Sequence, residues 1–195
     1  MATATDGMDM DLYSQVQAYV PYNDQERRDR EVLLALLDGG QDLYTRDNDL
    51  HHLTASAWVV SGDRDLVLMC YHNLYDSWSW LGGHADGERD LARVALREVA
   101  EESGLTRLRL VRPDIYSLEI LTVEGHVRRG AYVSSHLHLN LTYLVEADPT
   151  EPLRTKPDEN SALAWFSPQE AVARSTEPWF ATRIYPKLNE RMHGW

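Results

Sequence analysis

The chain has 195 residues, of which 43% are hydrophobic, and a formal net charge of −12. This length suits one domain with a buried core and an added N-terminal element, and leaves little room for a second full domain. The negative charge argues against long nucleic acids as partners, because their phosphates require basic surface, but it allows small phosphorylated molecules.

The composition also bears on the compartment and on cysteine chemistry. No segment joins a basic start to an apolar run, and none reaches the roughly 18–20 apolar residues that span a bilayer. We therefore expect a cytoplasmic protein that does not contact membranes.

The single cysteine, Cys70, excludes an intramolecular disulfide framework and a thiolate zinc site. It lies in the apolar run LVLMCYH, which predicts a buried thiol.

The N-terminal part predicts a leader and two helices. Residues 1–8 are interpreted as a flexible leader, and a short helix is expected over residues 12–19. Asn23 and Glu26 form an N-cap pair that opens a second helix, which runs to Asp38 before two glycines. We expect this second helix to pack onto the main domain.

The first strands follow these helices. Residues 53–61 and 65–72 are strand-like runs around a Ser-Gly-Asp-Arg turn, which predicts a hairpin in the core sheet. Residues 73–81 then lead to a glycine pair, with Trp78 and Trp80 on one side if the segment is extended. Aromatic residues here more often pack in a core, but Trp80 is a candidate to stack on a base.

Further strands are expected over residues 107–111, 114–123 and 131–147, with a turn over residues 124–130. The last strand alternates between an apolar and a polar face. Its polar face consists of Ser134, His136, His138, Asn140 and Thr142. Such a face either meets solvent or lines a pocket. We favour a pocket in which His136 and His138 contact substrate, because histidines are costly on a central strand.

The C-terminal part predicts a loop, a strand and two helices. A loop over residues 148–157 precedes a short strand at residues 161–166. Ser167 then opens a helix with an N1 proline and a capping box. Pro186 should kink or split a last helical stretch over residues 178–193.

Residues 82–105, GGHADGERDLARVALREVAEESGL, are the most informative stretch. Nothing between Gly87 and Gly104 breaks a helix, and apolar residues recur there at helical spacing. At about 100° per residue, Glu98, Glu101 and Glu102 fall together along the edge of the apolar stripe. The stretch therefore predicts a helix with three carboxylates on one face.

These carboxylates indicate a cation. Like charges at such spacings cost roughly 0.2–0.5 kcal/mol per pair in an isolated helix. Mg²⁺ or Mn²⁺ fits best, since hard cations take oxygen ligands. An isolated ExxEE pattern is more often a solvated helix face, so the surrounding residues decide between the two readings.

The surrounding residues follow a known pattern. From Gly83 the chain reads glycine, five residues, Arg89, seven residues, REV, one residue, Glu101-Glu102, one residue and Gly104-Leu105. This resembles the signature of the Nudix hydrolases, which is G, five residues, E, seven residues, REU, one residue, EE, one residue and GU, with U aliphatic. The chain matches every fixed position except Arg89, where the family has glutamate.

The resemblance implies a hydrolase that cleaves a diphosphate linkage in a nucleoside diphosphate derivative, or in a similar small phosphorylated compound, with a divalent cation. It implies that Glu98, Glu101, Glu102 and the backbone of Gly82 bind the metal. It further implies that Arg97 holds a glutamate of the motif in place.

Two more residues are candidates beside the motif. A further acidic ligand or base often comes from a later loop in this family, and Glu159 is our candidate. Asp158 and a purely structural loop remain open as alternatives. His84, directly after the glycine pair, either contacts a phosphate or braces the loop.

The departure at Arg89 leaves alternatives open. Glu88 stands next to it, and a shift of one residue would let Glu88 replace the missing glutamate. Otherwise the protein is a noncatalytic sensor of a nucleotide or metabolite. Isopentenyl diphosphate isomerase shares the fold, but it uses an active-site cysteine, and Cys70 lacks that motif context.

Interleaved strands and helices place the chain in the α/β class. The resemblance covers roughly residues 50–175 and implies an α/β/α sandwich with a mixed β-sheet. We divide the chain into an N-terminal leader and helical extension, residues 1–49, and a Nudix domain with C-terminal helices, residues 50–195. A homodimer is left open.

Overall fold

The computed structural model describes residues 11–128 and 130–195, so the leader expected at residues 1–8 lies outside the described part. The helices are α1 (Leu12–Ala18), α2 (Asp24–Asp38), α3 (Leu91–Ser103), α4 (Pro168–Arg174), the π-helix η1 (Phe180–Ile184) and α5 (Tyr185–Met192). The strands are β1 (His51–Val60), β2 (Val67–His72), β3 (Ser77–Ser79), β4 (Leu81–His84), β5 (Leu108–Leu110), β6 (Ser117–Val123), β7 (His126–Arg128), β8 (Ala131–Val133), β9 (His136–Ala147) and β10 (Asn160–Phe166).

A mixed sheet forms the centre of the fold. Its main order is β10-β2-β1-β9-β5, while β3 pairs with β2, β4 with β1 and β6 with β9. The long strands β1 and β9 pair in parallel, and the other pairs of this sheet are antiparallel. Both long strands are buried along most of their length, because helices cover the two faces of the sheet.

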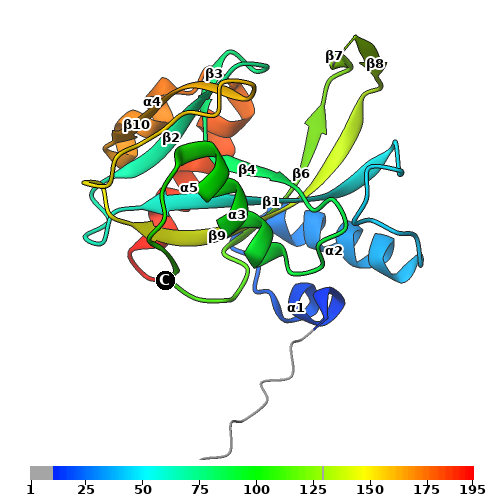
Figure 1. Ribbon diagram of the computed structural model, residues 1–195. Helices are drawn as coiled ribbons and strands as arrows, with labels where there is room; N and C mark the ends of the chain where they lie inside the picture. Colours follow the sequence, from blue (N-terminus) through cyan, green and yellow to red (C-terminus); the bar gives the residue numbers. More distant parts are fainter. Residues whose placement is uncertain (1–10, 129) are drawn as a thin grey trace, which may run out of the picture.

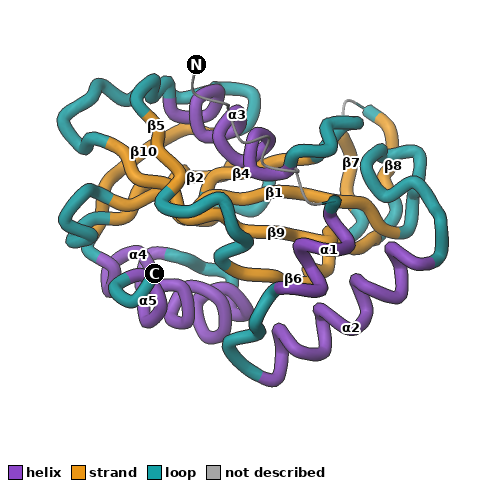
Figure 2. Tube along the Cα trace, turned by 90° about the horizontal axis from the view of Figure 1, so that it is seen from below, coloured by secondary structure: helices purple, strands orange, loops and turns teal. Residues whose placement is uncertain are grey.

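The helices form two layers around the sheet, as Figure 2 shows. α3 packs on β1 and β4, and its apolar residues Leu91, Val94, Ala95 and Val99 join a core that also includes residues of α1 and α2. α4, η1 and α5 cover the opposite face around a second core. These layers confirm the expected α/β/α sandwich with a mixed sheet.

The N-terminal helix α2 is joined to this sandwich by buried charges. It packs against β6, as expected, and its Glu26 is fully buried. Glu26 Oε1 lies 2.8 Å from Lys187 Nζ of α5, which lies 2.7 Å from Glu119 Oε1 of β6. Burial opposes ionisation of Glu26, but Lys187 and the hydrogen bonds around the carboxylate hold its pKa below the usual value. Three elements that are distant in sequence therefore share one ion-pair network.

The strand expected over residues 131–147 is wrong in extent. The chain forms two strands there, β8 and β9, and a further strand, β7, lies inside the turn expected over residues 124–130. β7 and β8 pair as a hairpin that projects from the body of the molecule (Figure 1). Gly130 has a φ of 82°, a left-handed conformation that allows the chain to reverse between these short strands.

The C-terminal helical stretch is continuous over residues 178–192, so the expected split at Pro186 does not occur, but the helix changes from π to α directly before the proline. η1 precedes α5, and Pro186 lies in the first turn of α5, where its missing N–H does not interrupt the helix. Among the described residues, no helix combines the length and apolar character that crossing a bilayer requires.

Candidate active site

The site begins where β4 passes closely between β1 and α3. A Cβ on Gly82 would lie 2.7 Å from the Cα of Ser56, and a Cβ on Gly83 would lie 2.6 Å from Cδ of Glu98. Only glycine at these positions lets the strand pair with β1 while the carboxylate of Glu98 lies against its backbone.

Arg97 fixes the orientation of Glu98. Its Nη2 donates to Glu98 Oε1 at 2.7 Å, and its Nε donates to the same oxygen at 3.3 Å. The same Nη2 also donates to the backbone oxygen of His84 at 3.1 Å. One guanidinium therefore joins the carboxylate of α3 to the end of β4, and the expectation that Arg97 steadies a glutamate of the motif has a geometric basis here.

Glu102 is the most deeply buried carboxylate of the motif, with 2% of its surface exposed. Its Oε2 accepts a hydrogen bond from the backbone N–H of Gly82 at 3.0 Å. Burial, with smaller contributions from Glu98 and Glu159, raises the pKa of Glu102 to about 8. Burial likewise raises the pKa of Glu98, although Arg97 opposes this shift. Both carboxylates occupy surroundings in which a nearby cation would stabilise the ionised form.

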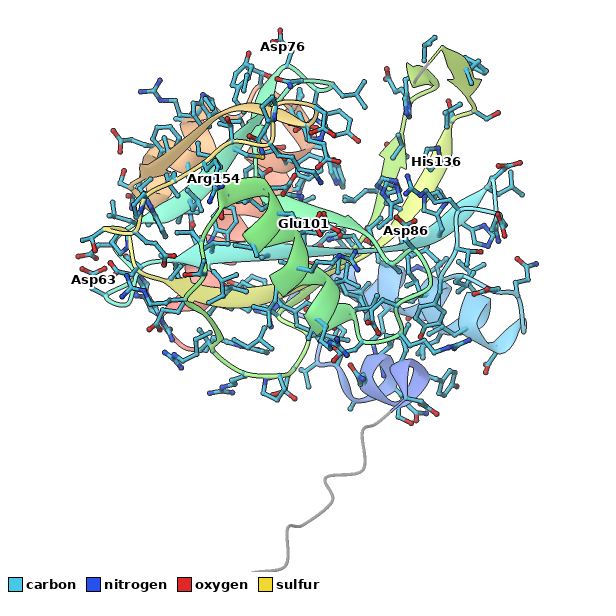
Figure 3. All side chains as sticks on the ribbon, viewed as in Figure 1. Asp63, Asp76, Asp86, Glu101, His136 and Arg154 are labelled. Atoms are coloured by element: carbon cyan, nitrogen blue, oxygen red, sulfur yellow. The ribbon has the colours of Figure 1, made fainter. Side chains whose placement is uncertain are left out.

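Glu101 and Glu159 meet through a lysine. Lys156 Nζ lies 3.2 Å from Glu101 Oε2 and 2.9 Å from Glu159 Oε2. Figure 3 labels Glu101 at α3, and its side chain is about half exposed. The loop before β10 thus brings Glu159 to the carboxylates of α3, where a residue acting as metal ligand or base would have to lie. We refer to the carboxylates of Glu98, Glu101, Glu102 and Glu159 as the acidic cluster.

Neither residue at the departure from the motif joins this cluster. Glu88 Oε1 accepts from the backbone N–H groups of Arg89 and Asp90 at 2.9 and 3.1 Å, and its Oε2 lies 4.0 Å from Arg93. Arg89 is exposed, with its guanidinium carbon 4.7 Å from the centre of the Tyr44 ring. In this structure Glu88 therefore satisfies backbone donors just before α3.

Histidines gather beside the acidic cluster. His84 and His138, both predicted to contact substrate, lie with their ring centroids 4.9 Å apart, and His136 is 5.1 Å from His138. A fourth ring, His52, lies within 5.2 Å of all three. Figure 3 labels His136 at the base of the β7–β8 hairpin, among several nitrogen-bearing side chains.

Burial favours the uncharged form of two of these histidines, His52 and His138, at neutral pH. It lowers the pKa of His138 to about 2, with the other rings, led by His84, adding to the effect. Burial also lowers the pKa of His52. Neutral imidazole carries a free nitrogen lone pair, which is the form that accepts a hydrogen bond or binds a metal.

Two further residues of the polar face of β9 neither contact solvent nor line a pocket, which were the two alternatives expected from the sequence. Asn140 and Thr142 are 1% and 0% exposed, so they meet neither solvent nor an open pocket. Asn140 Oδ1 accepts from the hydroxyls of Thr54 and Ser56 at 3.0 and 2.9 Å. Its Nδ2 donates to Glu119 Oε2 at 3.3 Å. This part of the face is a buried hydrogen-bond network, which satisfies polar side chains on a central strand.

Trp80 and Cys70 both lie in the interior. Trp80 is 8% exposed and packs in the second core against Phe180 and Tyr185, so its position favours packing over contact with a base. The Cys70 thiol is buried as predicted and donates to the backbone oxygen of Trp80 at 3.6 Å. Burial raises its pKa well above the usual value, which removes the thiolate that the isomerase alternative requires.

Two residues of the site escaped sequence analysis. Lys156 stands in a loop with no periodic pattern, and only its i, i+3 spacing to Glu159 could have suggested a pair. His52 stands at the start of β1, where its signal was the pair His51-His52 before an apolar strand.

Comparison with known proteins agrees with this arrangement. The family model of the NUDIX domain matches residues 50–188. The comparison with curated proteins found no significant match to the chain.

Three solved structures share the fold. The Caenorhabditis elegans Ap4A hydrolase, in a binary complex, is 17% identical, covers 73% of this chain and 98% of its own, and has a TM-score of 0.53. A NUDIX-family hydrolase from Clostridium perfringens is 21% identical, with coverages of 71% and 97% and a TM-score of 0.50. The Mycobacterium smegmatis Nudix hydrolase RenU is 16% identical, with coverages of 73% and 86% and a TM-score of 0.51.

At these identities the three structures demonstrate the common fold alone. The family model goes further, since it spans well over half of the chain and includes the complete β4–α3 unit. The protein therefore belongs to the NUDIX domain family, whose hydrolases act on pyrophosphate bonds.

Proposed function

We propose that the protein hydrolyses a diphosphate linkage in a nucleoside diphosphate derivative, or in a similar small phosphorylated compound, with Mg²⁺ or Mn²⁺. The observation that carries this proposal is the pair of buried carboxylates, Glu98 and Glu102, held against the backbone of Gly82 and Gly83. Carboxylate and backbone oxygens are the ligands that these cations prefer.

The charges of the acidic cluster fit a divalent ion. Its four carboxylates, when ionised, face two cationic side chains, Arg97 and Lys156. Two negative charges remain uncompensated, which is the charge that one Mg²⁺ or Mn²⁺ would neutralise. Glu98, Glu102 and Glu101 would hold the ion together with the backbone of Gly82.

Different side chains have different roles in the hydrolysis. A bound divalent cation neutralises charge on the phosphate oxygens and favours ionisation of water. Glu159 acts as general base and takes a proton from the water whose oxygen attacks phosphorus, while the bond between that phosphorus and the bridging oxygen breaks. Arg97 keeps Glu98 in its orientation.

A substrate screen with a matched variant tests the proposal. Nucleoside diphosphate derivatives and dinucleoside polyphosphates form the panel, with the latter included because one structural relative is an Ap4A hydrolase. We expect release of phosphorylated products that requires Mg²⁺ or Mn²⁺ and is abolished in Glu102→Gln. Glu146→Gln, at an ion pair with Arg109 outside the acidic cluster, should retain activity. A protein inactive across the whole panel would contradict the proposal.

The positions of Glu88 and Arg89 favour a second candidate, a noncatalytic sensor. The motif glutamate is absent, and Glu88 is engaged by backbone groups instead of replacing it. A sensor would bind a member of the same panel in calorimetry without product appearing on prolonged incubation. Turnover by the wild-type protein would exclude this candidate.

A further inference from the structure

Strand register brings three histidines together at one end of the sheet. In the parallel pair of β1 and β9, His52 lies directly opposite His138. β4 pairs with the other edge of β1, where His84 lies opposite Thr54, two residues beyond His52. His52, His84 and His138 each present one ring nitrogen to a common space, and these nitrogens all lie within 4.8 Å of one another.

We propose that His52, His84 and His138 bind a transition-metal ion of the Zn²⁺ type, at a site separate from the acidic cluster. Three atoms at most 4.8 Å apart all lie within about 2.8 Å of a common centre, so each ring needs to move by less than ~1 Å to reach the 2.0–2.1 Å of a Zn–N bond. Ring movements of this size do not require the strands to separate.

The hydrogen bonding of His52 prepares one nitrogen for a metal. Its Nδ1 lies 3.2 Å from the backbone oxygen of Asn48, so the ring carries its proton on Nδ1 and donates it there. Its Nε2 is buried and has no hydrogen-bond partner among the described residues. Metal-binding histidines characteristically donate one ring N–H to a carbonyl and offer the other nitrogen to the ion. A buried, unpartnered acceptor is costly unless something occupies the space before it.

His136 is a hydrogen-bond partner of His138. Its Nδ1 lies 2.8 Å from the backbone oxygen of Ser134, which leaves the lone pair on Nε2. That Nε2 lies 3.2 Å from Nε2 of His138. His136 Nε2 therefore accepts a hydrogen bond from His138 Nε2–H, which leaves the lone pair of His138 on Nδ1. His136 thus orients one of the three ligands and is not itself a member of the set.

The ligand type separates this site from the acidic cluster. Imidazole nitrogens suit Zn²⁺ and its first-row neighbours, whereas Mg²⁺ takes oxygen ligands. Within the described residues, the group consists of histidines without a carboxylate, which does not match the mixed histidine and carboxylate set of non-haem iron sites. Three histidines with a further coordination position form the kind of set that holds a Zn²⁺ with an open position.

Cobalt titration tests the site without relying on enzymatic activity. Co²⁺ replaces Zn²⁺ in tetrahedral sites and absorbs visible light there, whereas Mg²⁺ does not. We expect chelator-treated wild-type protein to bind one equivalent of Co²⁺ with a visible band that Zn²⁺ removes and excess Mg²⁺ leaves unchanged. X-ray absorption of the Zn²⁺ form should show nitrogen neighbours at about 2.0–2.1 Å.

Variants assign the ligands. His84→Gln and His138→Gln should each weaken Co²⁺ binding by more than the about 10–100-fold that loss of an outer hydrogen-bond partner causes. His193→Gln, an exposed histidine just after α5, is the matched control and should bind as the wild type does. Far-ultraviolet circular dichroism and the melting temperature check that each variant is folded.

The outcomes separate this proposal from the proposed hydrolase activity. Glu102→Gln should keep the Co²⁺ band, because it changes only the acidic cluster. Absence of the band in the wild type, or an unchanged affinity in both folded histidine variants, would overturn the histidine site. If the variants do not fold, the wild-type band and its nitrogen shell decide alone. Failure of the diphosphate assay leaves these measurements unaffected.

Discussion

At the scale of single residues, the glutamates of the β4–α3 region differ because of their neighbours. Glu102 is buried, and its pKa rises to about 8. Glu88, next to two backbone N–H groups, has its pKa held below the usual value. Glu101 is half exposed and shared between Arg97 and Lys156. One residue type thus supplies a buried carboxylate, a backbone acceptor and an accessible charge within fifteen residues.

The first prediction concerns the general base. Glu159→Gln should lower kcat by about 10²–10⁴-fold, the usual contribution of a positioned base, with little change in KM. Asp158→Asn is the matched control because Asp158 is the exposed neighbour, and it should leave kcat unchanged. Steady-state kinetics on the best substrate of the panel measures both. A larger loss of kcat in Asp158→Asn than in Glu159→Gln would identify Asp158 as the general base.

The second prediction concerns the close contact at Gly83. A Cβ there would lie 2.6 Å from Cδ of Glu98, so Gly83→Ala must displace this carboxylate. Misplacement by about 1 Å can cost on the order of 10²-fold in rate, and we expect a loss of kcat/KM of that size. In the control Gly62→Ala, the new Cβ would meet Glu146 Oε1 at an ordinary 3.5 Å and should leave kcat/KM unchanged. Equal effects of the two changes would argue against the contact.

At the scale of elements, the limits of α3 depend on its caps. The apolar pattern predicted a helix after Gly87, but the helix begins at Leu91, because the backbone of Asp90 is extended, with φ −84° and ψ 95°. Asp90 is the N-cap, and its Oδ1 accepts from the N–H of Arg93 at 3.1 Å. Gly104, with a φ of 73°, ends the helix in the left-handed conformation.

The third prediction tests this N-cap. Asp90→Ala removes the acceptor and should lower the free energy of unfolding by about 0.5–2 kcal/mol. Asp90→Asn keeps a side-chain oxygen at the same position and should stay close to the wild type. Urea unfolding followed by circular dichroism measures both variants. Equal destabilisation would show that charge, rather than capping, accounts for the role of Asp90.

The elements also show what a sequence can predict. The acidic face of α3 was accessible because helix geometry fixes neighbours three and four residues apart. The contact between His52 and His138 could not be predicted from the sequence. It depends on the register of a parallel strand pair whose members are distant in sequence. The position of Lys156 was not accessible either, since the path of a charged loop has no periodic signal. β7 escaped because three residues are too few for an alternating pattern.

At the scale of the whole molecule, the buried network of Glu26, Lys187 and Glu119 joins the N-terminal extension to both the sheet and α5. Ser117 donates to Glu26 Oε1 at 2.8 Å, and Tyr19 donates to its Oε2 at 2.6 Å. Loss of one partner would leave a buried charge uncompensated, which typically costs about 3–5 kcal/mol. The extension and the domain therefore share part of their stability.

The fourth prediction is an acid dependence of this stability. The pKa of Glu26 in the folded protein lies below its usual value of about 4.3, so its contribution is present above that value and is lost as the pH falls through the lowered pKa. Glu26→Gln should be less stable than the wild type at neutral pH. The difference should be constant above about pH 5 and shrink as the pH falls below the usual pKa of a glutamate, measured by urea unfolding. A constant difference would contradict the assignment.

The same network has a consequence for the order in which the chain folds. Among the described residues, the cationic partners of Glu26 lie in α5, where Arg191 is 165 residues further along the sequence and Lys187 slightly less far. A buried carboxylate without these cations is costly, so we expect the packing of α2 on β6 to be stable only when α5 is in position. We therefore expect α2 to dock late in folding, together with α5.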